Sequence, residues 1–435
     1  MNADINPVAS INGCIKLPSS KPHMQRSLFL AFLNQKKTTI KNVTWCSETE
    51  LLFANLIKLG LKVHKHSDEM LVLQGADITT IPQNIQVDAE GSGFIFRVLL
   101  AIASLCNGLR IKCNASLYNR DSVLDKNYLE FLSVRVVKHI TEQLFIVSRT
   151  ESVSNNITTD KSSQFLSMSL IIAPFIDKSE VVVQGDVNGV GYIEMTSSMM
   201  AQFGYLVHET PIGYSVRKNK DVDVEFSLPT DFTSLGYILS ALSSMREKSQ
   251  VVVQNYINGS TTNEIILLRV FSLLGVNSTV DNGMLYLLRH ETISPPLHVI
   301  ADLGELPSLA TLILPSLAHS VPHSELSSLS HVNNHKCQRV FVMLENMKKL
   351  GVQTEFLFDD SGRFDGTHLY SPQNLPGGIR LKSYKDHRVC AGNIIMALGC
   401  HDKCTVEDVN TLADGFPGFL DVLSQVGVNI NLSVH

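Results

Sequence analysis

The chain has 435 residues, a formal net charge of -5 at pH 7, and hydrophobic residues at 44% of its positions. This length favours two or three domains, and the 18% share of charged residues, without long basic runs, argues against a nucleic acid partner. No apolar run reaches the ~20 residues needed to cross a bilayer, and the start MNADINPVAS lacks the basic and apolar regions of a signal peptide. We therefore expect a cytoplasmic protein with no membrane partner.

From the N-terminus onward, the chain repeats one pattern: a cluster of small, polar or charged residues, then about ten mostly apolar ones. The six copies cover residues 18–33, 89–105, 161–175, 229–244, 304–320 and 384–399. The clusters contain residue types that cap helices, and the runs behind them are apolar on nearly every face. Each copy is therefore predicted to form a helix that is buried in a core.

Other predicted elements fill the intervals between these helices. Residues 46–63 and 339–356 have the polar and apolar faces of helices that cover a core. β-Branched runs at 180–186, 213–218 and 249–256 predict strands. The repeat thus reads as strand, helix, strand, helix and further strands. Six such units predict an α+β fold and divide naturally into two domains of three units.

The polar clusters have two interpretations. In the first, they only cap six similar core helices. In the second, they bind anions, because a helix N-terminus carries unpaired N–H groups and about half a positive charge. If the three core helices of a domain lie parallel, their N-termini share one face. Two facing domains would then make a positive cleft for a small, multiply anionic substrate.

Three of the clusters are the most specific: LPSSKPHMQR from residue 17, SSQFL with AP and GYIEMT behind it, and YKDHR at 384–388. All six occur in an order that resembles the enolpyruvyl transferase family, and the resemblance to its shikimate branch is closer. It implies two globular domains, each of three βαβαββ-type units, in an inside-out α/β barrel-like fold. It implies an N-terminal domain at 16–228, a discontinuous C-terminal domain at 1–15 and 229–435, and hinges near 15–19 and 227–231. The active site is expected in the cleft between the domains.

The resemblance also implies roles for individual side chains. Hydroxyl and amide donors at a helix start suit a phosphate, and arginine pairs with carboxylate and phosphate in a bidentate manner. The implied ligands of shikimate-3-phosphate are Lys21, Arg26, Ser162, Ser163, Gln164, Tyr192, Ser308 and His331. The implied ligands of phosphoenolpyruvate, or of a second anion, are Gly93, Arg120, Arg339 and Arg388.

The proton-transfer positions depart from the family's pattern. Ser308 stands in place of an aspartate, His335-Lys336 in place of a lysine–glutamate pair, and Asp414 in place of a late lysine. A neutral serine does not accept a proton as a carboxylate does at pH 7. Each lost acid–base group is expected to cost ~100- to 10,000-fold in rate. Histidine shuttles protons near neutrality, so His335 is a candidate to replace part of this apparatus.

The candidate catalytic residues are therefore Lys21, Ser308, His335 and Lys336. His331 and His335 are four residues apart, like two metal ligands on one helix face. No third ligand is evident near them in the sequence, so we expect no metal and no cofactor.

Three functions fit these residues. The first is a divergent carboxyvinyl transferase that joins phosphoenolpyruvate to shikimate-3-phosphate or a similar phosphorylated cyclohexene carboxylate. The second is an enzyme of the same fold that eliminates phosphate or water from such a substrate. The third is a ligand-binding protein without catalysis. The family resemblance favours the first, whereas the altered proton-transfer residues favour the second. Small anions are the expected partners in each case, and the chain is expected to be a monomer.

Overall fold

The computed structural model describes residues 1–67, 69–151, 154–160, 162–259, 261–290, 296–304, 306–333 and 337–433. These residues form two compact units: unit 1 comprises Met1–Ser19 and Pro229–His435, and unit 2 comprises Ser20–Leu228. Within the described residues, no helix is both long and apolar enough to span a bilayer. The fold is α+β, as the sequence predicts.

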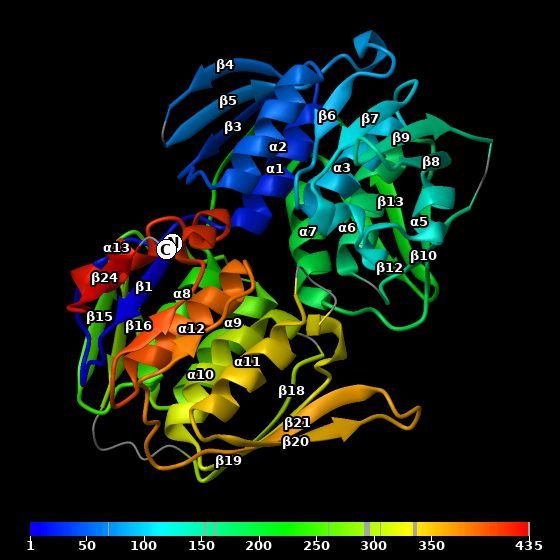
Figure 1. The fold of residues 1–435 in the computed structure, drawn as a ribbon. Helices are drawn as coiled ribbons and strands as arrows, with labels where there is room; N and C mark the ends of the chain where they lie inside the picture. The colour runs from blue at the N-terminus through cyan, green and yellow to red at the C-terminus, as the bar shows by residue number, and fades with distance from the viewer. Residues whose placement is uncertain are drawn as a thin grey trace. The chain divides into compact units, whose positions relative to one another are not determined.

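Unit 2 contains three mixed sheets of four strands within the described residues (Figure 1). In spatial order, the first consists of β14 (Val224–Ser227), β3 (Lys37–Lys41), β5 (Met70–Gln74) and β4 (Lys62–His66). The second consists of β6 (Gln86–Asp88), β7 (Leu109–Lys112), β9 (Leu144–Arg149) and β8 (Val134–His139). The third consists of β10 (Asn156–Thr158), β11 (Glu180–Gln184), β13 (Gly213–Lys218) and β12 (Tyr205–Thr210).

Unit 1 repeats this arrangement in its described residues. Its first sheet consists of β16 (Val276–Asp281), β17 (Met284–Arg289), β15 (Ser249–Val253) and β2 (Asn12–Ile15). Its second consists of β18 (His298–Asp302), β19 (His323–Ser327), β21 (Phe364–Tyr370) and β20 (Gln353–Phe358). Its third consists of β22 (Arg380–Leu381), β23 (Cys404–Val406), β1 (Asn2–Ile5) and β24 (Ile430–Ser433).

Every one of these sheets joins one parallel pair to two antiparallel pairs. A parallel pair requires a crossover. A core helix supplies it in four of these pairs: α3 connects β6 to β7, α6 connects β10 to β11, α10 connects β18 to β19, and α12 connects β22 to β23. The strands of the other two pairs, β3 with β14 and β2 with β15, are far apart in sequence. The repeating strand–helix pattern of the sequence is therefore confirmed in six copies.

The six predicted core helices are present, and nearly all their residues after the first turn are buried. Unit 2 has α1 (Lys21–Leu33), α3 (Gly93–Ala103) and α6 (Ser163–Ile172), and unit 1 has α8 (Phe232–Ser243), α10 (Ala310–Ser320) and α12 (His387–Leu398). The other helices are α2 (Ser47–Lys58), α4 (Ala115–Tyr118), α5 (Lys126–Phe131), α7 (Val190–Gln202), α9 (Thr262–Leu273), α11 (Arg339–Lys349) and α13 (Phe419–Gln425). In unit 1, α8, α10 and α12 pack on one another.

Capping by the polar clusters is confirmed at four of the six core helices. Side-chain oxygens of Ser92, Ser162, Asp231 and Asp386 accept N–H groups of the first turns of α3, α6, α8 and α12. The expectation is wrong for α10, whose preceding residue is Leu309. At α1, Ser20 makes no capping bond with its side chain; its hydroxyl instead lies 2.8 Å from Nδ1 of His23.

Residues 16–19 group with unit 1, rather than with the N-terminal domain where the sequence placed them. Hydrogen bonds explain this. Asn255 donates to the carbonyl of Leu17 over 2.8 Å, and the N–H of Asp231 donates to the carbonyl of Pro18 over 2.9 Å. The N-terminal strands β1 and β2 also pair with strands from the C-terminal half of the chain, which is why unit 1 is discontinuous.

Candidate functional site

The N-terminal halves of α1, α3, α6 and α7 meet around Arg26 of α1. Its Nε donates to Oγ1 of Thr196 on α7 over 2.8 Å, and its Nη2 donates to Oγ of Ser167 on α6 over 3.2 Å. Its guanidinium also lies 5.7 Å from the ring of Phe94 on α3 and 5.9 Å from the ring of Tyr192 on α7. Side chains from three core helices of unit 2, α1, α3 and α6, therefore contact one another near Arg26.

Arg26 is a buried cation with neutral partners. Only 2% of its surface is exposed, and its third hydrogen bond runs from Nη1 to the carbonyl of Pro22 over 3.1 Å. Burial lowers the pKa of Arg26 to about 10, against the opposing effect of Tyr192, so the side chain stays charged at neutral pH. A buried charge is costly unless it is paired, and hydroxyl and carbonyl oxygens solvate it without neutralising it. An anion at this position would offset that cost.

The serine and glutamine cluster begins α6. Oγ of Ser162 accepts the N–H of Gln164 over 3.2 Å, so this serine does cap the helix, as the simpler interpretation required. A Cβ atom at Gly189, where φ is +68°, would lie 3.1 Å from Oγ of Ser163 and 3.6 Å from the ring of Tyr192. Gly189 thus lets the start of α7 approach Ser163 of α6 closely.

Lys21, at the first position of α1, forms an ion pair with Glu48 of α2. Its Nζ lies 3.1 Å from Oε2 of Glu48, and each side chain is 18% exposed. The partner is a residue that the sequence analysis did not consider. It holds the ammonium group at the start of α1.

Lowering the pH should destabilise unit 2 through His23. Burial, followed by the charge of Arg26, lowers the pKa of His23 from 6.5 to about 3. Below pH 6.5 the unfolded chain therefore binds a proton that the folded chain does not. The stability that neutral His23 contributes is complete above pH 6.5 and is lost as the pH falls toward 3, at up to ~1.4 kcal/mol per pH unit. Urea unfolding of wild type and His23→Gln between pH 7 and 4 checks this; equal losses in both proteins would contradict it.

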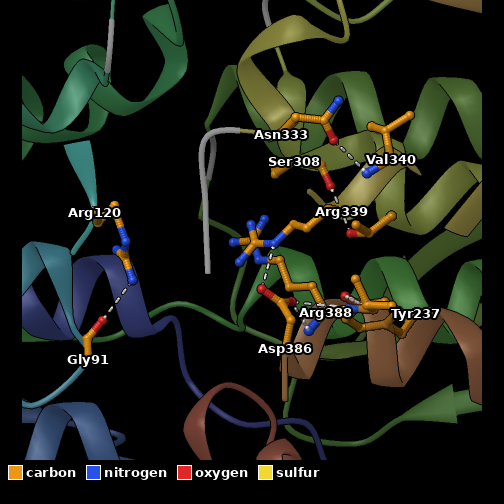
Figure 2. Close-up of polar contacts among 11 residues, drawn as sticks. Gly91, Arg120, Tyr237, Ser308, Asn333, Arg339, Val340, Asp386 and Arg388 are labelled. Atoms are coloured by element: carbon orange, nitrogen blue, oxygen red, sulfur yellow. Dashed lines mark hydrogen bonds and ion pairs between the residues drawn. The ribbon is translucent and has the colours of Figure 1, made fainter. Parts of the chain in front are cut away.

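Gly93 and Arg120 lie together at the start of α3. A Cβ atom at Gly93 would lie 2.7 Å from Nη1 of Arg97 and 3.3 Å from Nη1 of Arg120, so only glycine leaves room for both guanidinium groups. Nη2 of Arg120 donates to the carbonyl of Gly91 over 3.3 Å (Figure 2). The structure thus brings together both unit 2 residues that the resemblance assigned to phosphoenolpyruvate.

In unit 1, the arginines of the predicted second-anion set meet at the start of α12. Nε of Arg339 lies 2.9 Å from Oδ2 of Asp386, which is fully buried, and the N–H of Arg388 donates to Oδ1 of Asp386 over 2.9 Å (Figure 2). Tyr237 on α8 donates its hydroxyl to the carbonyl of Arg388 over 3.2 Å. Burial alone would raise the pKa of Asp386, but the charge of Arg339 and three hydrogen bonds hold it below its usual value.

Ser308 lies in the short 3₁₀ turn Pro307–Leu309 before α10. Its carbonyl accepts Oγ1–H of Thr311 over 3.4 Å, while its own Oγ is buried and has no hydrogen-bond partner in the described part of the chain. A buried hydroxyl without a partner is uncommon. It is therefore available to a group that the described protein residues do not supply.

The remaining predicted residues lie near α11. His335 and Lys336 are outside the described residues, and His331 belongs to the turn Ser330–Asn333, which precedes them. Asn333 accepts the N–H of Val340 in the first turn of α11 over 3.0 Å (Figure 2). In the ranges that the structure describes, no group of three or more potential metal ligands occurs.

Besides Glu48, three residues of these clusters were not predicted from the sequence. Arg97 was visible only as a charge inside an apolar run, and such a residue needs a buried polar partner. Asp386 belongs to the YKDHR match. Its position before a predicted helix indicates a capping residue, but nothing in the sequence indicates its ion pair with Arg339. Tyr237 lies within an apolar helix and carries no sequence signal.

Comparisons with known proteins agree with this architecture. A family model described as EPSP synthase (3-phosphoshikimate 1-carboxyvinyltransferase) matches residues 5–423. A 3-phosphoshikimate 1-carboxyvinyltransferase of Methanosphaera stadtmanae is 23% identical, covering 98% of this chain and 99% of the relative. One from Clostridium botulinum is 24% identical, covering 97% and 96%.

Two solved structures have a similar fold. The EPSP synthase of Acinetobacter baumannii has a TM-score of 0.71 at 18% identity and covers both chains fully. The enolpyruvyl transferase NikO of Streptomyces tendae has a TM-score of 0.70 at 14% identity, covering 99% of this chain and 98% of its own. At these identities the likeness concerns the fold.

Proposed function

The chain belongs to the EPSP synthase family, and from that premise we propose that it is a carboxyvinyl transferase. Its acceptor is shikimate-3-phosphate or a similar phosphorylated cyclohexene carboxylate, and its donor is phosphoenolpyruvate. The observation that carries this proposal is the buried Arg26, whose hydrogen bonds within the described residues run to the neutral oxygens of Thr196, Pro22 and Ser167. Ser167 lies on α6, the helix that the Ser162–Gln164 cluster begins. Such a site favours a ligand with two separate anionic groups.

We assign the acceptor to unit 2. Arg26 binds the carboxylate of the cyclohexene acid, and Ser162, Ser163 and Gln164 bind its phosphate through hydroxyl and amide donors. Ser162 can do so while it caps α6, because its oxygen accepts from Gln164 and its hydroxyl hydrogen remains a donor. Tyr192 lies beside Arg26 and is placed to line the ring.

We assign the donor to the arginines. Arg120 and the backbone at Gly93 contribute from unit 2, and Arg339 and Arg388 contribute from unit 1. One carboxylate oxygen of Asp386 accepts a hydrogen bond from Nε of Arg339. In this proposal the Nη groups of Arg339 bind the anion. Lys21, held by Glu48, adds a further positive charge.

The transfer requires defined proton movements. The acceptor hydroxyl loses its proton and adds to C2 of phosphoenolpyruvate, while C3 gains a proton. The tetrahedral adduct then expels phosphate, loses a C3 proton and leaves an enol ether. Because Ser308 replaces the family's aspartate, we assign proton transfer to His335, whose usual pKa lies near neutrality. Ser308 then contributes a hydrogen bond, and Lys336 contributes positive charge.

Elimination of phosphate or water from the cyclohexene substrate is the second candidate. The neutral, buried hydroxyl of Ser308, where the family has a carboxylate, is the observation that favours it. An elimination would use the anion-binding residues without the complete proton-transfer set of the transfer reaction.

One incubation distinguishes these candidates. The protein is mixed with shikimate-3-phosphate, with phosphoenolpyruvate, or with both, and phosphate release and product mass are followed. Under the proposal, phosphate appears only with both ligands, together with a product heavier than shikimate-3-phosphate by one carboxyvinyl group. Phosphate from shikimate-3-phosphate alone would support elimination instead. Tight binding of both ligands without any product would leave only a binding function.

A further inference from the structure

Arg97 on α3 is a second buried cation of unit 2. Only 5% of its surface is exposed, and its guanidinium lies 4.3 Å from the ring of Phe165 on α6. Burial lowers the pKa of Arg97 to about 10, with Tyr128 opposing and the positive charge of Arg120 adding to the effect. The side chain is thus charged at neutral pH in an environment that resists a charge.

The hydrogen bonds of Arg97 reach two segments far away in sequence. Nη1 donates to Oε1 of Gln164 over 2.8 Å, and Nη2 donates to the carbonyl of Ser122 over 3.0 Å. Nε is buried and has no hydrogen-bond partner among the described residues. Both acceptors are neutral, so these two hydrogen bonds solvate the charge without forming an ion pair. The carboxylate of Asp125 favours the charged form of Arg97 through its electrostatic effect.

The contact with Gln164 determines the orientation of its amide. A guanidinium group only donates hydrogen bonds, so the amide must turn its oxygen toward Arg97. The amide nitrogen of Gln164, with both of its hydrogens, then points away from Arg97. The ring of Phe165, the next residue, packs against the guanidinium, so Arg97 contacts two consecutive residues of the first turn of α6.

We propose that Arg97 is a positioning residue, which orients Gln164 so that its NH₂ group is presented to an anion bound at the start of α6. Arg97 acts through Gln164 and does not itself touch the ligand. The identity of the anion as a substrate phosphate rests on the proposed function above. The orientation of the amide rests only on the contacts of Arg97.

The proposal predicts opposite effects of Gln164→Glu on stability and on binding. The new carboxylate would pair with Arg97 and raise the melting temperature, since a buried charge gains most from a counter-charge. The same change replaces an anion donor by an acceptor. Affinity for shikimate-3-phosphate, measured by calorimetry, should fall by about 10- to 100-fold, the effect of losing a hydrogen bond to a charged group.

The helix dipole requires a control, because a carboxylate at a helix start is stabilising without any partner. We therefore compare the gain in melting temperature from Gln164→Glu in wild type and in Arg97→Gln. The gain should be larger in wild type, and equal gains would overturn the proposal. The exposed Gln86→Glu on β6 controls for the change in net charge. These measurements need no ligand.

A second comparison separates positioning from general support of the fold. Arg97→Lys keeps the positive charge but loses the planar donor pair. If Arg97 acts through Gln164, the Arg97→Lys/Gln164→Ala double variant binds shikimate-3-phosphate as weakly as Gln164→Ala alone. Losses that multiply would overturn the proposal. If wild type binds no shikimate-3-phosphate, the proposed function fails, while the melting temperatures still decide whether Arg97 orients the amide.

Discussion

Replacing Asp386 with alanine should lower the free energy of unfolding by about 3–5 kcal/mol, the usual cost of breaking a buried ion pair. Asp386 is 0% exposed and Arg339 is 7% exposed. The substitution leaves the Arg339 guanidinium buried without its counter-charge. It also removes the N-cap of α12, because the Asp386 side chain accepts the N–H groups of Arg388 and Val389 in the first turn of that helix.

Two variants test which of these losses dominates, with urea unfolding followed by circular dichroism. Asp386→Asn keeps a capping oxygen but removes the charge, so it should remain strongly destabilising. Thr261→Ala removes the cap of α9, where Oγ1 accepts the N–H of Glu264, without removing a charge, and should cost about 1 kcal/mol. If Asp386→Ala cost no more than Thr261→Ala, the ion pair would contribute nothing to stability.

The pH dependence of the same pair gives an independent check. The pKa of Asp386 is held below its usual value of 3.8, so its contribution to stability is present above pH 3.8. The contribution is lost as the pH falls through the folded-state pKa. The difference in stability between wild type and Asp386→Asn should therefore shrink at acid pH and remain constant near neutrality.

Replacing Ser308 with aspartate should raise the rate of the transfer reaction by ~100-fold or more, the usual contribution of a general acid–base group. The family resemblance implies an aspartate at position 308. The Oγ of Ser308 is already buried and without a partner in the described chain, so the new carboxylate would occupy a site that lacks a proton acceptor. The initial rate of phosphate release with both ligands measures the effect.

The gain should increase with pH, because burial raises the pKa of a carboxyl group and only the ionised form accepts a proton. Ser308→Asn, of similar size but unable to ionise, is the matched control and should give no gain. A rate that falls or stays unchanged in Ser308→Asp would indicate that the reaction does not use a carboxylate there. That result would favour elimination over transfer.

The sequence indicated which residues belong to the candidate site more readily than it indicated their hydrogen-bond and ion-pair partners. Arg26, Gly93, Ser162 and Arg388 were recognisable because each belongs to a short polar cluster at a helix start. Their partners were not recognisable. The pair of Arg97 with Gln164 spans 67 residues and the pair of Arg339 with Asp386 spans 47, and no local pattern connects residues so far apart.

The surroundings in the folded chain also determine what individual side chains of unit 2 can do. Lys21 was predicted as a substrate ligand and catalytic residue, and the structure pairs it with Glu48. Ser162 was predicted as a ligand, and its oxygen also caps α6. His23, without a predicted role, is kept neutral at pH 7 by burial next to Arg26. In each case the neighbours determine which charges and donors remain available.

By itself, the sequence determined the repeating unit, the six core helices and the α+β class. Helix caps, apolar runs and β-branched runs are local features, so they indicate helices and strands without knowledge of the tertiary contacts. Only the tertiary structure decided which strands complete which sheet. Residues 1–15, which the family resemblance already placed with the C-terminal half, pair there through β1 and β2. Residues 16–19 also group with unit 1, because Leu17 and Pro18 accept hydrogen bonds from Asn255 and Asp231. It also decided that Arg26 and Arg97 are buried among neutral oxygens, since the cost of a buried charge depends on three-dimensional surroundings that the order of residues does not state.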